Sequence, residues 1–153
     1  MSKAKVLFLC TGNSARSQMA EGYLRQAAAD EFEPLSAGID PKGLNPLAVE
    51  AMQEIGIDIS QQKSKDVRNF LGQAIPYVIT VCDNAKQQCP IFPRTYKFLH
   101  WSLDDPAEAT GSHDDKLAVF RRVRDEIVER IQRERLRHKD KWDDVLKIFD
   151  KAL

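Results

Sequence analysis

The stretch Val6-Leu7-Phe8-Leu9-Cys10-Thr11-Gly12-Asn13-Ser14-Ala15-Arg16-Ser17 decides how this chain folds. Its first four residues are apolar and predict a buried β-strand. A short polar turn follows Cys10, and residues 17–25 have the pattern of an α-helix. The chain therefore begins with a strand, a tight loop and a helix, and a cysteine ends the strand.

A loop between a strand and a helix start is suited to binding an anion. Its backbone N–H groups converge, and the helix N-terminus adds partial positive charge. The guanidinium of Arg16 offers two parallel donors to two oxygens of one anion. The same positive field favours the thiolate of Cys10, so we expect its pKa to be lowered. Residues 10–17 thus predict a nucleophilic sulfur beneath a bound tetrahedral oxyanion. The alternative, a buried cysteine beside an incidental turn, leaves Arg16 and the helix start unexplained.

Strands and helices alternate along the rest of the chain. Short apolar segments predict further strands at 32–36, 77–81 and 96–99, with helical patterns between them. This alternation predicts an α/β fold with a parallel sheet. Sites in such sheets form at the carboxyl ends of the strands, so Cys10, Cys82 and the loop after residue 99 are expected to meet at one edge.

The C-terminal third is expected to be helical. Residues 114 to about 138 form one long amphipathic pattern. A second apolar set, Trp142, Val145, Leu146 and Phe149, predicts a helical extension over about 139–153. We expect this extension to pack on the domain; an oligomer contact is the alternative.

The whole-chain composition limits the class of protein. The 153 residues predict one domain, 1–153. No N-terminal apolar run is long enough for a signal peptide or a membrane span, so we expect a cytoplasmic protein without a membrane partner. A formal net charge of +0 argues against nucleic acid as a main partner.

The chain has three cysteines, Cys10, Cys82 and Cys89. An odd number in a cytoplasmic chain indicates thiol chemistry rather than a framework of structural disulfides. The histidines show no metal-ligand spacing with them, so no metal site is expected.

The loop and several later motifs resemble the low-molecular-weight protein tyrosine phosphatases and, within that superfamily, the thioredoxin-coupled arsenate reductases. The segments that carry the resemblance, from residue 5 to about 133, are residues 10–17, Ser17-Gln18-Met19-Ala20-Glu21-Gly22, Ser36-Ala37-Gly38, Asn45-Pro46, Gly56-Ile57-Asp58-Ile59-Ser60, Cys82, Cys89-Pro90, His100-Trp101, Asp104-Asp105-Pro106 and Phe120-Arg121-Arg122-Val123-Arg124-Asp125-Glu126-Ile127. The resemblance implies a four-stranded parallel sheet with helices on both faces.

The resemblance also implies roles for individual residues. Cys10 is the nucleophile, Ser17 stabilises its thiolate, and Asp105, directly before Pro106, is the general acid. Asn13 is expected to hold the shape of the loop, because asparagine tolerates a left-handed backbone. The substrate-binding residues are Thr11, Gly12, Asn13, Ser14, Ala15, Arg16 and Ser17.

Cys82 and Cys89 decide between arsenate and phosphotyrosine as substrate. Reduction of arsenate takes two electrons, which two thiols supply by forming a disulfide. The resemblance implies that Cys10 attacks arsenate, Cys82 attacks Cys10, and Cys89 attacks Cys82. External thioredoxin then reduces the final disulfide, with no bound cofactor. Phosphate and sulfate are expected to mimic the substrate.

Two other readings remain open. One is a protein tyrosine phosphatase with incidental cysteines, although no aromatic residue follows Pro106 to flank a tyrosyl ring, the sequence there being Ala107-Glu108-Ala109. The other is a non-enzymatic redox or metal sensor, against which Arg16 and the anion loop weigh.

Two further expectations concern individual segments. Some members of the family bind potassium through residues matching Asn13, Glu21, Ser36 and an aspartate; here that aspartate position is Lys65, whose ammonium would repel or replace the ion. Residues 83–88 predict a short helix capped by Asp83, which must unwind before Cys82 and Cys89 can join.

Overall fold

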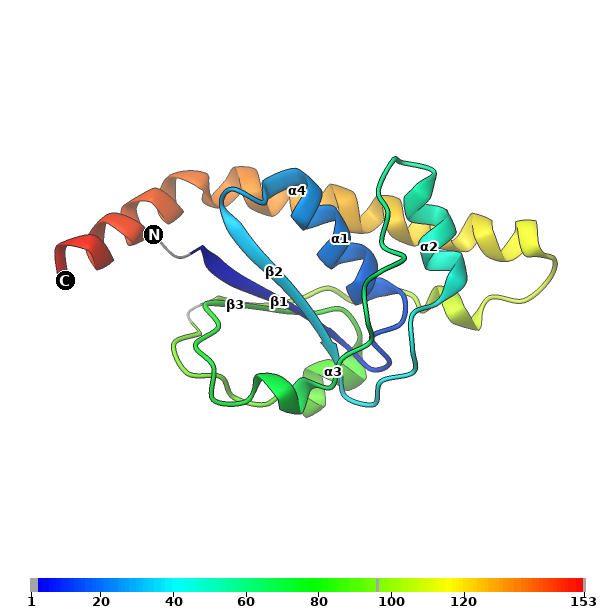
Figure 1. The fold of residues 1–153 in the computed structure, drawn as a ribbon, viewed down its shortest axis with the longest axis horizontal. Coiled ribbons are helices and arrows are strands. Elements are labelled where there is room, and N and C mark those ends of the chain that lie inside the picture. The colour runs from blue at the N-terminus through cyan, green and yellow to red at the C-terminus, as the bar shows by residue number, and fades with distance from the viewer. Residues whose placement is uncertain (1–2, 96, 153) are drawn as a thin grey trace.

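The computed structural model describes residues 3–95 and 97–152, with side chains described up to Glu134. Its centre is one sheet of four parallel strands in the order β2-β1-β3-β4 (Figure 1). The strands are β1 Ala4–Cys10, β2 Phe32–Gly38, β3 Tyr77–Thr80 and β4 Lys97–His100. The expected α/β fold with a four-stranded parallel sheet is confirmed.

The strands end where the reactive groups lie. β1 ends at Cys10, which pairs with Gly38 of β2. β3 ends at Thr80, which pairs with His100 of β4. Cys82 follows the end of β3 directly before the next helix. Because all four strands run in one direction, these residues share the carboxyl edge of the sheet.

Helices cover both faces of the sheet, as expected. α1 and α4 pack side by side on one face with α2 next to them, and α3 lies on the other side (Figure 1). The helices are α1 Arg16–Ala28, α2 Pro46–Gln53, α3 Asp83–Gln88 and α4 His113–Ala152, with short 3-10 turns η1 Val67–Phe70 and η2 Pro106–Glu108. Asn45 caps α2 by accepting from the Leu47 amide at 2.8 Å, as the Asn-Pro pair predicts.

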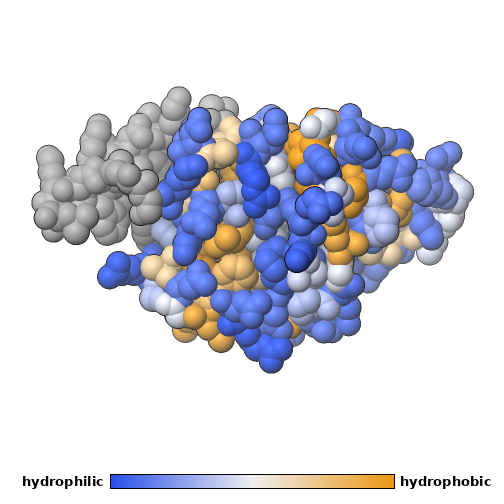
Figure 2. Space-filling model, viewed as in Figure 1, coloured by the Kyte–Doolittle hydropathy of each residue, from blue (hydrophilic) through white to orange (hydrophobic). Residues whose placement is uncertain are grey.

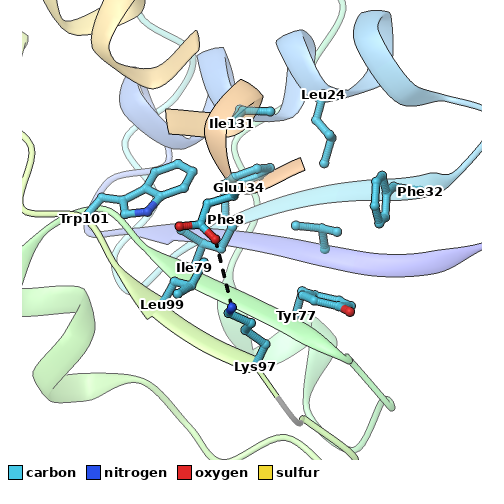
Figure 3. A pocket seen from close by; sticks show the side chains of 11 residues that line it. Phe8, Leu24, Phe32, Tyr77, Ile79, Lys97, Leu99, Trp101, Ile131 and Glu134 are labelled. Atoms are coloured by element: carbon cyan, nitrogen blue, oxygen red, sulfur yellow. Dashed lines mark ion pairs between the residues drawn. The ribbon is translucent and has the colours of Figure 1, made fainter. Parts of the chain in front are cut away.

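The core between the sheet and the α1/α4 layer contains a small hollow. Phe8 of β1, Leu24 of α1 and Ile131 of α4 line it (Figure 3). Its volume is about 60 Å³, and at its side Lys97 lies 4.0 Å from Glu134. The lining is mostly apolar and contains none of the three cysteines. The hollow is therefore a packing gap rather than a site of reaction.

α4 is one continuous helix. Leu117, Phe120, Val123, Ile127 and Ile131 are buried along it, as the apolar stripe predicts. The helix runs on to Ala152, so residues 139–152 are helical as expected, but they continue α4 and do not form a second helix. No glycine or proline stands between residues 131 and 152 to end the first helix. The packing expected of the set that begins at Trp142 concerns side chains outside the described residues.

An ion cluster joins α2 to α4. Arg121 donates to both carboxylate oxygens of Glu54 at 2.8 and 2.6 Å, and Arg124 donates to Glu54 at 3.0 Å. Arg124 also donates to the Ala51 carbonyl at 2.8 Å. The hydrogen bonds from Arg121, followed by those from Arg124, hold the pKa of Glu54 down at about 2.

The surface is mainly hydrophilic on the face shown in Figure 2, with apolar residues gathered in a few places. Among described residues, the exposed large apolar side chains are those of Ile55, Leu71, Ile91 and Phe98. Within the described part of the chain, no helix has the length and apolar character needed to cross a membrane.

Candidate active site

The anion loop joins β1 to α1 and is tied to the chain that follows β2. The carbonyls of Cys10, Thr11, Gly12 and Ser14 accept hydrogen bonds of 2.8–3.1 Å from amides in residues 39–45. These carbonyls are thus engaged on the outer side of the loop. No side chain caps α1, whose N-cap residue is Ala15. The helix start and the loop amides therefore suit an oxyanion.

Cys10 lies at the base of the loop with 2% of its surface exposed. Its sulfur is 2.8 Å from the Ser17 hydroxyl and accepts from the Asn13 amide at 3.0 Å. Both contacts, and the charge of Arg16, favour the thiolate. Burial nevertheless dominates and raises the pKa of the Cys10 thiol above its ordinary value. The expectation of a lowered pKa is wrong for this structure. Removal of water from around the sulfur disfavours the thiolate more than the hydrogen bonds of the loop and the charge of Arg16 favour it.

Asn13 holds the loop in shape. Its φ of 46° lies in the left-handed region, as expected for asparagine in such a loop. Its side chain donates to Ser17 at 2.8 Å and accepts from the Lys65 amide at 2.8 Å and from Gln18 at 3.1 Å. The side chain is fully buried, so these bonds satisfy groups that water cannot reach.

Arg16 is the cation of the site. Its guanidinium donates to the carbonyl of Leu103 at 3.0 Å and lies 3.7 Å from Asp105. Asp105 in turn caps η2 by accepting from the Ala107 amide at 3.0 Å. Contacts between segments far apart in sequence thus hold in place both the guanidinium of Arg16 and the carboxylate of Asp105, the expected acid.

A cavity of about 450 Å³ opens over the loop. Its lining brings together the predicted loop residues, the expected acid and a wall that the sequence analysis missed. The lining residues are Cys10, Thr11, Gly12, Ser14, Ala15, Arg16, Lys42, Gly43, Leu44, Asn45, Pro46, Asp105 and Ala107. No aromatic ring is among them. Asn13 and Ser17 lie beneath the loop instead, as fully buried supports.

The missed wall runs from Lys42 to Pro46. The Lys42 side-chain stem lies over Gly12, and its ammonium is 2.7 Å from Asp40. The Asn45-Pro46 cap was a visible signal for a helix start, but no sequence pattern indicates that this helix start faces the anion loop.

Cys82 contacts the loop, whereas Cys89 lies beyond α3. The sulfur of Cys82 is 3.2 Å from the Thr11 hydroxyl and accepts from the Ala85 amide at 3.4 Å. Cys82 is therefore the N-cap of α3, and the expectation that Asp83 caps it is wrong by one residue. Cys89 is half-buried at the other end, and burial raises its pKa to about 11.

The Lys65 ammonium occupies the place expected for a cation. It lies 3.4 Å from a Glu21 oxygen and donates to the Lys63 carbonyl at 2.6 Å. The same Glu21 oxygen accepts from Ser36 at 3.0 Å. Within the described residues, no group of three or more histidine, cysteine or acidic side chains is placed to hold a metal ion.

The chain matches the family described as low molecular weight phosphotyrosine protein phosphatase over residues 5–139, and it belongs to that family. Its relatives within the family include arsenate reductases. An arsenate reductase of Halalkalibacterium halodurans is 52% identical over 132 residues, which cover 86% of this chain and 95% of the relative.

Solved structures agree with this placement. A structure described as an arsenate reductase in the phosphate binding state matches with a TM-score of 0.75 at 35% identity, covering 85% of this chain and 95% of that one. A thioredoxin-dependent arsenate reductase of Corynebacterium glutamicum matches with a TM-score of 0.62 at 29% identity, covering 88% and 63%.

Proposed function

We propose that this protein reduces arsenate to arsenite with electrons that pass through Cys10, Cys82 and Cys89 and are supplied by thioredoxin. The observation that carries the proposal is the contact of 3.2 Å between Cys82 and Thr11, which places a second thiol against the anion loop that holds Cys10. A phosphatase has no use for a thiol there. Two thiols at one oxyanion site suit a two-electron reduction.

Arsenate fits the loop because it is a small tetrahedral dianion. The backbone amides of residues 11–17, apart from that of Asn13, which donates to the Cys10 sulfur, bind its oxygens together with the guanidinium of Arg16. Phosphate and sulfate have the same shape, so they compete with it. The lack of an aromatic wall in the cavity favours such inorganic anions over an aryl ester.

The first step joins sulfur to arsenic. The Cys10 sulfur attacks arsenate, an As–OH bond breaks, and the hydroxyl leaves as water with the proton of the thiol. We assign delivery of that proton to Asp105, which lines the cavity beside Arg16. The product is a thioarsenate ester on Cys10, still at the As(V) level.

The second and third steps move electrons between sulfurs. Cys82, as thiolate, attacks the Cys10 sulfur, the S–As bond breaks, and arsenic leaves with the electron pair as arsenite. Cys89 then attacks Cys82 as a thiolate and releases the Cys10 thiolate. The disulfide is now Cys82–Cys89, and the anion loop is ready for another arsenate.

The surroundings of Cys89 suit an external protein reductant. Ile91 is 97% exposed and Phe98 is 47% exposed. Both line a hollow of about 270 Å³ together with Cys89. An exposed apolar surface beside the Cys82–Cys89 disulfide, one sulfur of which a reductant thiolate must attack, favours docking of another protein. The relative from Corynebacterium glutamicum described as thioredoxin-dependent makes thioredoxin our proposed partner.

The test is arsenite formation by the full chain with thioredoxin, thioredoxin reductase and NADPH. We expect one NADPH oxidised for each arsenite formed, and inhibition by phosphate and sulfate. Hydrolysis of p-nitrophenyl phosphate measures the second candidate function, phosphatase activity, which the family membership favours and which we expect to be weak. Hydrolysis of p-nitrophenyl phosphate without any formation of arsenite would reverse the assignment.

A further inference from the structure

A hydrogen-bonded chain ties the start of α3 to the sheet. The Thr80 hydroxyl, at the end of β3, lies 2.7 Å from Nδ1 of His100, which ends β4. Nε2 of His100 lies 2.9 Å from a carboxylate oxygen of Asp83, the first residue of α3. Asp83 directly follows Cys82, so this chain ends one residue from the second thiol of the proposed relay.

The chemistry of the partners sets the proton positions. A carboxylate only accepts, so Nε2 of His100 carries the hydrogen and donates it to Asp83. The Thr80 hydroxyl donates to Nδ1 when the ring is neutral. His100 is thus satisfied on both nitrogens, and its side chain is 17% exposed. Thr80 is fully buried and holds the ring in place from within the sheet.

The Cys82–Cys89 disulfide cannot form while α3 is intact. The two cysteines flank the helix, and seven residues at about 1.5 Å each separate their Cα atoms by roughly 10 Å. A disulfide needs Cα atoms within about 7 Å. Oxidation must therefore unwind α3, and every contact that holds the helix favours the reduced thiols.

α3 has few such contacts. Ala85 is its one buried residue, and a helix this short is not stable by its own hydrogen bonds. Asn84 donates to the Thr11 hydroxyl at 3.0 Å, and Asp83 accepts from His100. The Ser102 hydroxyl, two residues beyond β4, donates to the same Asp83 oxygen at the longer distance of 3.4 Å. The bond from His100 is therefore the shorter of the two that join the first turn of α3 to β4 and the residues after it.

We propose that the Asp83–His100 pair is a latch that holds α3 in the reduced state and so sets the reduction potential of the Cys82–Cys89 couple. His100 is a positioning residue in this scheme, since it touches neither substrate nor sulfur. The inference rests on the relay proposed above. Without the latch, α3 unwinds more readily and the disulfide becomes easier to form and harder to reduce.

The potential is measured in the Cys10→Ser protein, which confines the disulfide to Cys82 and Cys89. The full chain is equilibrated in dithiothreitol buffers. In that exchange the dithiol is oxidised to its cyclic disulfide, and Cys82 and Cys89 receive the two electrons and two protons. His100→Asn, too short to reach Asp83, should raise the equilibrium constant for protein disulfide formation about fivefold. This is a fall in potential of about 20 mV, since about 30 mV corresponds to tenfold.

A double-mutant cycle separates the pair from the general effect of removing a charge. Asp83→Ala also removes a negative charge from the start of α3, and that contribution cancels in the cycle with His100→Asn. If the pair acts as a unit, either substitution alone already breaks the latch. The double variant then shows no further change in reduction potential from loss of the latch. Full additivity of the two shifts would overturn the proposal.

His113→Asn is the matched control. His113 makes the same kind of contact, 3.0 Å from a carboxylate oxygen of Glu50, between the start of α4 and α2. The His113→Asn substitution should leave the reduction potential of the Cys82–Cys89 couple unchanged. Amide exchange of residues 83–88 in the reduced protein should be about fivefold faster in His100→Asn and unchanged in His113→Asn.

The outcomes distinguish the latch from the relay. If Cys10→Ser forms no Cys82–Cys89 disulfide, the proposed relay fails and the latch with it. If the disulfide forms but His100→Asn leaves both the potential and the exchange of α3 at the parental values, the latch alone is refuted.

Discussion

Replacing Gly38 by alanine tests whether the anion loop depends on the close approach of β2. A Cβ there would lie 2.7 Å from the Thr11 carbonyl oxygen and 2.9 Å from the Asn13 amide nitrogen. Both are backbone atoms that cannot rotate away, so the loop must shift. Over-packing of this kind costs about 1–3 kcal/mol. At roughly 2–4 °C per kcal/mol for a domain of this size, we expect Tm to fall by about 2–12 °C.

The same shift moves the amides that bind the oxyanion. A loss of about 1.4 kcal/mol in binding is tenfold in affinity, so we expect phosphate to bind at least about tenfold more weakly. Thermal melts and calorimetric titration with phosphate measure the two effects. Gly72→Ala is the control: its φ of +82° strains an alanine, but nothing lies within 4 Å of the new Cβ. It should lower Tm and leave phosphate affinity unchanged. A Gly38→Ala protein with parental Tm and affinity would refute the reasoning.

Three other predictions use the thiols and two charged side chains. Cys10→Ser should abolish both arsenate reduction and any phosphatase activity, whereas Cys82→Ser and Cys89→Ser should abolish only arsenate turnover; normal cycling of Cys89→Ser with thioredoxin would contradict the relay. The pKa of Glu54 is about 2 against an ordinary 4.5, so the unfolded chain binds more protons between these values. This contribution to stability is present above about pH 4.5 and is lost as the pH falls towards 2. Glu54→Gln should therefore flatten the acid slope of urea melts, and an unchanged slope would count against it. Potassium should not raise Tm relative to sodium, because Lys65 occupies the place of the ion. Lys65→Asp should create a potassium-specific rise in Tm. Such a rise in the parent protein would exclude this explanation.

The parts of the site that lie within one strand, loop and helix could be predicted from sequence. Residues 6–17 form β1, the loop and the start of α1, and the positive φ of Asn13 is where the residue type favours it. The stripe from Leu117 to Ile131 is buried along α4. Such features depend on hydrogen bonds and periodicity among residues close in the chain, which the residue types report directly.

Features that depend on burial were missed or wrong. The pKa of Cys10 is raised rather than lowered, because the packing of the sheet and helices around the sulfur, and not the loop alone, decides how much water reaches it. The cap of α3 is Cys82 rather than Asp83, which instead faces His100. The chain leaving β3 directs the Cys82 side chain to the start of α3, where its sulfur accepts from the Ala85 amide, and directs the Asp83 side chain to His100 of β4.

The sequence by itself therefore determined the kind of fold, the anion loop and the three thiols. Tertiary structure alone decided that Thr11 meets Cys82, that Lys42 walls the cavity, and that His100 joins Asp83. The reason is physical. A contact between neighbours in the chain follows from local geometry, whereas a contact between distant segments depends on the strand order β2-β1-β3-β4 and the register that places their ends side by side.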